Sequence, residues 1–180
     1  MDLSAINPIL LIAALMSAAT PILLAATGEL VVERAGVLNL GVEGMMITGA
    51  ICGFAIAVET GSPLTGFIAA AVGGAVLSLL FAFLTQITLA NQVASGLALT
   101  LFGLGLSALL GQSYVGIKPP RMPDLNFGFL ADIPVVGSIL FSHDPILYFS
   151  LLLVTAVWAT LKYLSLIHIS EPTRLWSGSR

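Results

Sequence analysis

The chain has 180 residues, of which 58% are hydrophobic and only 8% are charged, and its formal net charge is −3. A soluble domain is about 25% charged because its surface must meet water, so this composition indicates a membrane protein. The small net charge and the scattered basic residues exclude a nucleic-acid-binding surface. The single cysteine, Cys52, excludes an intrachain disulfide and any multi-cysteine metal site.

Five segments are long and apolar enough to cross a bilayer, whose core of about 30 Å requires roughly 20 apolar residues per helix. They cover residues 9–27, 37–58, 64–89, 93–110 and 146–163. The first residues lack the basic region of a cleavable signal peptide, so the first segment is expected to be a permanent helix. We predict an all-α, polytopic membrane protein with about five transmembrane helices.

A long connection over residues 111–145 separates the fourth and fifth segments. It contains several prolines, among them the pair Pro119-Pro120, together with several glycines. These residues favour turns and loops over a continuous helix. We predict a long loop, whose apolar middle at residues 127–140 could hold a short re-entrant or interfacial helix.

The second segment carries two polar residues, Asn39 and Glu43. A charge at the bilayer centre costs about 2.5–3.5 kcal/mol on insertion scales, and polar side chains there usually face the protein interior or a water-filled path. In a helix the two residues would share a face, because they are four positions apart. They are candidates for lining a water-filled path, which would be the path of a solute if the protein is a transporter. In the alternative, Glu43 is a structural acid that ties the backbone of Gly41 and Gly44 to a neighbouring helix.

A second polar cluster, Glu29, Glu33 and Arg34, precedes the second segment. Glu29 and Glu33 are spaced to share one helix face, and Arg34 could pair with either acid or with an outside partner. The cluster is predicted to lie at the membrane interface. Both a solvated structural cluster and a direct functional role remain open.

Two further polar pairs are interpreted structurally. Asn91 and Gln92 precede the fourth segment and are predicted to cap it together with Ser95, because a side-chain oxygen can accept from the first free N–H groups of a helix. His143 and Asp144 lie beside Pro145 and indicate a turn, since one His-Asp pair falls short of a metal site.

The run Glu-Arg-Ala-Gly-Val-Leu-Asn-Leu-Gly-Val-Glu-Gly-Met-Met at residues 33–46 resembles the second-helix signature of ABC importer permeases of the nucleoside and simple-sugar type. The resemblance extends through residues 20–29 and resumes at residues 91–100. It implies a permease subunit that forms the solute path by alternating access, in the bacterial inner membrane. The implied partners are a second permease subunit, cytoplasmic ABC ATPase subunits and an extracellular or periplasmic solute-binding protein.

The resemblance implies that nucleosides or related small solutes are carried, and no cofactor is expected. The sequence has no G-x-x-x-x-G-K-[ST] loop, so this chain cannot bind ATP in the Walker manner and is not expected to be an enzyme. Two alternatives remain open. One is an ion-coupled carrier or channel with Glu43 as its coupling site, and the other is a non-transporting membrane scaffold.

Charge does not decide the orientation of the chain. Alternating five helices puts Arg34 and Lys162 on one side and Lys118 and Arg121 on the other, which ties the positive-inside count. The resemblance implies that the segment after the fifth helix faces the cytoplasm. The N-terminus and the 111–145 loop are then predicted to be extracellular.

Residues 164–180 do not continue the pattern of apolar membrane segments seen in the rest of the chain. Residues 164–174 match the translation of a common transposase-type sequencing adapter. We therefore expect residues 1–163 to be the N-terminal part of an importer transmembrane domain, and residues 164–180 to be a non-native tail. A genuine juxtamembrane tail is the alternative.

Small residues recur along the predicted helices. Gly49 and Gly53 form a G-x-x-x-G, and Gly96 and Gly103 are one heptad apart. Such positions let helix backbones approach closely in lipid. They are predicted to pack helices within one subunit, with a subunit–subunit contact as the alternative.

Overall fold

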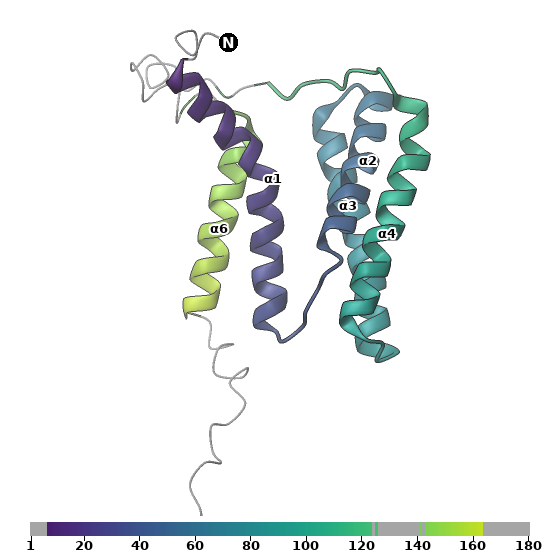
Figure 1. Ribbon diagram of the computed structural model, residues 1–180. Helices are drawn as coiled ribbons and strands as arrows, with labels where there is room; N and C mark the ends of the chain where they lie inside the picture. Colours follow the sequence, from purple (N-terminus) through teal and green to yellow (C-terminus); the bar gives the residue numbers. More distant parts are fainter. Residues whose placement is uncertain (1–6, 124, 126–140, 142, 164–180) are drawn as a thin grey trace, which may run out of the picture. The chain divides into compact units, whose positions relative to one another are not determined.

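The computed structural model describes residues 7–123, 125, 141 and 143–163. All regular elements in these ranges are helical (Figure 1). They are α1 (Pro8–Arg34), α2 (Val42–Thr60), α3 (Pro63–Ala82), the π-helical turn η2 (Phe83–Ile87), α4 (Gln92–Gly111), the 3₁₀ turn η3 (Gln112–Tyr114) and α6 (Pro145–Tyr163). Five of the resulting spans are long and apolar enough to cross a membrane. The predicted all-α, five-span architecture is confirmed.

The boundaries of the first two helices differ from the prediction. Helix α1 continues to Arg34 rather than ending at residue 27, and α2 begins at Val42 rather than at residue 37. Gly36 ends α1 with a left-handed φ of 83°, a conformation that glycine adopts without steric cost. Residues 37–41 are consequently not helical. The helix predicted within residues 127–140 lies outside the described residues.

The chain divides into two compact units. Residues 1–36 and 123–180 form one unit, and residues 37–122 form the other. The first unit is built on α1 and α6, which run in the same direction (Figure 1). Ser17 of α1 and His143, just before α6, are joined by a 3.2 Å hydrogen bond between Oγ and Nδ1. His143 is buried, so it fixes the beginning of α6 against α1 and is more than a loop turn.

The second unit contains α2, α3 and α4, and glycines bring these backbones together. A Cβ atom on Gly66 of α3 would lie 2.5 Å from the Cβ of Ala57 in α2. A Cβ atom on Gly103 of α4 would lie 2.5 Å from the carbonyl oxygen of Gly44 in α2. Side chains larger than hydrogen do not fit at these crossings, so small-residue packing within one subunit is confirmed.

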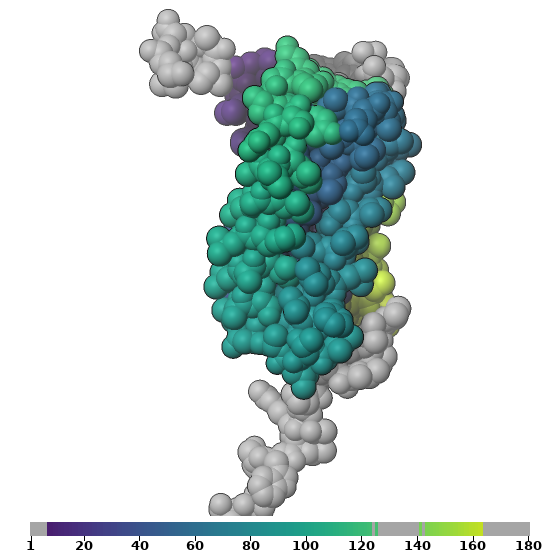
Figure 2. Space-filling model, turned by 90° about the vertical axis from the view of Figure 1, so that its right-hand side faces the viewer, coloured from purple at the N-terminus to yellow at the C-terminus, as the bar shows by residue number. Residues whose placement is uncertain are grey.

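The interior of this second unit is small and its outside is apolar. Leu77, Phe81 and Leu99 form the buried hydrophobic cluster. Figure 2 looks onto the face formed by α3 and α4, which lie side by side. Both helices carry exposed apolar side chains, such as Leu79 at 69% and Leu101 at 71% exposure. In a membrane-spanning helix such side chains suit contact with lipid rather than water.

Candidate functional site

The candidate site is the non-helical segment at residues 37–41 that leads into α2. Helices are stable in lipid because they satisfy their own backbone hydrogen bonds, and a non-helical segment must find other partners. The backbone N–H of Leu38 donates to Oε1 of Gln92 at 2.8 Å. The hydroxyl of Thr100 donates to the carbonyl oxygen of Leu40 at 3.0 Å. Two side chains of α4 therefore replace the bonds that a helix would supply.

Asn39 closes the turn before α2. Its Oδ1 accepts from the backbone N–H of Gly41 at 2.9 Å, and its Nδ2 lies 3.6 Å from Sδ of Met45. The side chain is only 8% exposed. The prediction that Asn39 and Glu43 share a helix face is wrong, because Asn39 precedes the helix. The local bond to Gly41 stabilises a turn in competition with the helix.

Glu43 is the second residue of α2, in its first turn. Its side chain is exposed. A carboxylate in the first turn interacts favourably with the positive end of the helix dipole, so the fold favours an acid at this position. The bond to the Gly41 backbone that a structural Glu43 was expected to provide comes instead from Asn39.

The beginning of α2 is recessed along α4. A Cβ on Gly41 would lie 3.4 Å from Cα of Gly96, and one on Gly44 would lie 2.6 Å from Cα of Thr100. Gly96 is four residues into α4, which is about 6 Å along the axis at 1.5 Å per residue. The first residue of α2 therefore lies beside the second turn of α4, about 6 Å along the α4 axis from its start. The non-helical segment 37–41 runs alongside the first turn of α4. Glu43 is carried at that recessed helix end.

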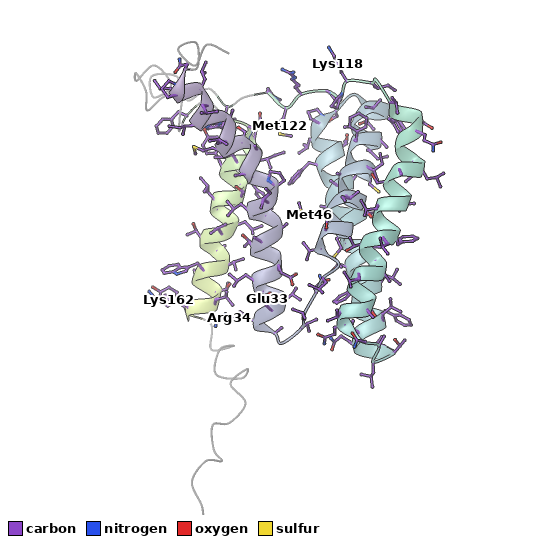
Figure 3. All side chains as sticks on the ribbon, in the orientation of Figure 1. Glu33, Arg34, Met46, Lys118, Met122 and Lys162 are labelled. Atoms are coloured by element: carbon purple, nitrogen blue, oxygen red, sulfur yellow. The ribbon has the colours of Figure 1, made fainter. Side chains whose placement is uncertain are left out.

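The predicted interfacial cluster lies in the other unit, on the last two turns of α1. Glu33 and Arg34 are exposed and Glu29 is half-buried. The two acids share a helix face, as predicted, because α1 continues through them. Arg34 is the last residue of α1, where a cation complements the negative end of the helix dipole. Figure 3 shows Glu33 and Arg34 at the same end of this unit as Lys162 of α6.

Of the two amide residues predicted to cap α4, one does so. Asn91 is the N-cap, and its Oδ1 accepts from the N–H of Ala94 at 3.1 Å. Gln92 does not cap α4, since its oxygen is used by Leu38. The part played by Thr100 was missed, although Thr100 closes the 91–100 run at which the resemblance resumes. In the described part of the chain, no three His, Cys, Asp or Glu side chains gather closely enough to hold a metal ion.

Comparison with known proteins identifies the family of this chain. Residues 11–166 match the family described as the branched-chain amino acid transport system/permease component. The chain belongs to this family. With five apolar spans, it is a multi-pass membrane protein, which confirms the expected location in the bacterial cell membrane. The resemblance seen in the sequence is confirmed, and the family gives no support to a carrier, channel or scaffold.

Three curated relatives are similar over most of the chain. One, from Haloferax volcanii, is provisionally named a glucose ABC transporter permease protein and is 42% identical over 82% of this chain. The guanosine ABC transporter permease protein NupQ of Bacillus subtilis is 33% identical over 79%. The nucleoside ABC transporter permease protein NupC of Lactococcus lactis is 28% identical over 74%. The matches cover 46%, 48% and 45% of those proteins, so the chain spans about half their length. No solved structure matches the chain.

Proposed function

We propose that this chain is part of the permease subunit of an ATP-driven importer and contributes to the path of a small polar solute. Family membership over residues 11–166 supports the proposal. The relatives are named for glucose, guanosine and nucleosides, which all contain a hydroxyl-rich sugar ring. Nucleosides or related sugars are therefore the proposed solute class.

The recessed start of α2 is the observation that carries this proposal. Irregular backbone at membrane depth is tolerated where it is buried in protein or lines a water-filled cavity. Transporters often place solute sites where a helix is interrupted and its N-terminus points at the solute. We assign Glu43, exposed in the first turn of α2, to the wall of the path, and Asn39, buried in the preceding turn, to holding that wall in place.

The remaining components are proposed to be separate proteins. The sequence contains no Walker loop, which supports ATP hydrolysis on cytoplasmic ATPase subunits. A second permease subunit and an extracellular solute-binding protein complete the proposed importer. The extracellular placement of the N-terminus and of the 111–145 loop stays a prediction, as does the non-native origin of residues 164–180.

The test is the energy source of uptake. The full-length subunit is reconstituted in liposomes with its partner subunits and binding protein, and uptake of labelled guanosine and glucose is measured. We expect uptake of at least one solute that requires ATP, stops when the Walker lysine of the ATPase subunit is replaced, and persists after a protonophore is added. Uptake that continues with the inactive ATPase and collapses with the proton gradient would contradict the proposal.

A further inference from the structure

A groove lies between α1 and α6, near the end of this unit where both helices terminate. Its volume is about 370 Å³. One wall is formed by residues of α1 spaced on a single helix face, and the other by the last three turns of α6. The lining residues are Thr27, Leu30, Arg34, Val154, Val157, Trp158, Leu161 and Lys162.

The groove combines two cations with apolar walls. Arg34 and Lys162 are both exposed and lie at the same end of the helix pair (Figure 3). The Lys162 ammonium lies 4.6 Å from the centre of the Trp158 ring and 5.4 Å from that of Tyr163. Aromatic side chains of this kind are enriched at membrane–water interfaces. The residues at the charged end of the groove are therefore of the types that proteins place at the level of the lipid headgroups.

The two acids near the end of α1 lie outside the lining of this groove. Neither Glu29 nor Glu33 is among its lining residues. Glu33 precedes Arg34 directly, and adjacent residues on a helix do not face each other. The hydroxyl of Thr27 donates to the Leu23 carbonyl in its own helix at 2.6 Å, so it adds no free donor. Binding by this groove would depend on the two cations and the aliphatic wall.

We infer that the groove binds an anionic phospholipid. The phosphate would lie between the Arg34 guanidinium and the Lys162 ammonium, and an acyl chain would follow Leu30, Val154 and Val157. Arginine recognises phosphate through paired N–H donors, and basic pockets between transmembrane helices bind anionic headgroups. A free phosphate ion would gain nothing from the apolar wall, which is why the inference commits to a lipid.

The test compares two double variants of the full-length subunit by native mass spectrometry. The first, Arg34→Gln with Lys162→Gln, removes both cations of the groove. The matched control, Lys118→Gln with Arg121→Gln, removes the same charge from the other unit. Each is titrated with phosphatidylglycerol and with phosphatidylcholine, and size-exclusion chromatography confirms that each variant is intact.

We expect the unmodified subunit and the control to retain phosphatidylglycerol in preference to phosphatidylcholine. The groove variant should bind phosphatidylglycerol roughly 30-fold more weakly, as expected for two surface cations, and its binding of phosphatidylcholine should not change. Equal binding of both lipids by the unmodified subunit, unchanged binding in the groove variant, or an equal loss in the control would overturn the inference. Displacement of the lipid by millimolar inorganic phosphate would identify a free-anion site instead, and binding of neither lipid would also overturn the inference.

Discussion

The two units of this chain are held together in different ways. In the α2–α3–α4 unit, Gly103 packs against the backbone of Gly44, and Gly66 packs against the Ala57 methyl group and the Gly53 carbonyl oxygen, so no side chain larger than a methyl group separates the helices at these crossings. In the α1–α6 unit, the described contacts are made by side chains, including the Ser17–His143 hydrogen bond, and a groove remains between the helices. Close backbone packing accompanies the irregular 37–41 segment, while the α1–α6 pair carries the exposed cations Arg34 and Lys162.

This contrast explains why the non-helical segment lies in one unit and the groove in the other. A non-helical segment in a membrane protein needs partners at fixed positions, and Gln92 and Thr100 are fixed because α4 is packed tightly against α2. The proposed lipid site needs only two long side chains and an apolar wall. Substitutions in the two units should therefore differ in their effect on stability.

The largest effect is expected at the α2–α4 crossing. Gly103→Ala places a Cβ 2.5 Å from the Gly44 carbonyl oxygen, whereas Gly105, two residues later, has nothing within 4 Å. Overpacking of this kind typically costs about 1–3 kcal/mol, and backbone contact favours the upper end. Thermal unfolding of the full-length subunit in detergent should show a clear loss for Gly103→Ala and none for Gly105→Ala. Equal melting temperatures would show that the two helices are not packed as described.

A smaller effect is expected from the support of the 37–41 segment. Thr100→Val keeps the shape of the side chain but removes the donor to the Leu40 carbonyl, a loss of about 0.5–1.5 kcal/mol for a typical intramolecular hydrogen bond. Thr155→Val is the control, because its hydroxyl bonds to the Leu151 carbonyl four residues earlier in its own helix. We expect the same unfolding assay to distinguish the two variants. A loss no larger for Thr100→Val than for Thr155→Val would mean that the segment does not depend on α4.

Much of the fold could be predicted from hydropathy, because five apolar runs separated by turn residues admit few other architectures. The ends of the helices could not. Residues 37–40 are mostly apolar and resemble the start of a spanning helix, whereas the chain resumes its helix only at Val42. What decides this is the left-handed Gly36 and the turn bond of Asn39, neither of which changes the hydropathy.

The hydrogen-bond partners of the 37–41 segment could not be predicted from the sequence around it. Gln92 and Thr100 lie 54 and 60 residues from the backbone groups that they bind. Glu43 was identified because a charge in an apolar run is conspicuous, and it does lie at the start of α2. Asn39 was identified for the same reason, but its assigned helical geometry was wrong. A polar residue in an apolar run thus marks a site without revealing its conformation.

The central claim is that Glu43 lines the solute path rather than supporting the fold. Glu43→Gln removes a charge at an exposed position in the first turn of α2, so the free energy of unfolding should change by no more than about 1 kcal/mol, the size of a helix-dipole interaction. Glu59→Gln, near the other end of α2, is the matched control; Glu59 accepts a 2.7 Å hydrogen bond from Tyr114.

The decisive measurement is ATP-dependent uptake by the reconstituted importer carrying Glu43→Gln, normalised to the amount of assembled complex. We predict normal assembly with uptake reduced about tenfold, equivalent to about 1.4 kcal/mol, while Glu59→Gln transports normally. Normal uptake with Glu43→Gln would contradict the account: loss of assembled complex with Glu43→Leu would then give the residue a structural role, and normal assembly and uptake with both variants would give it no role in the path or the fold.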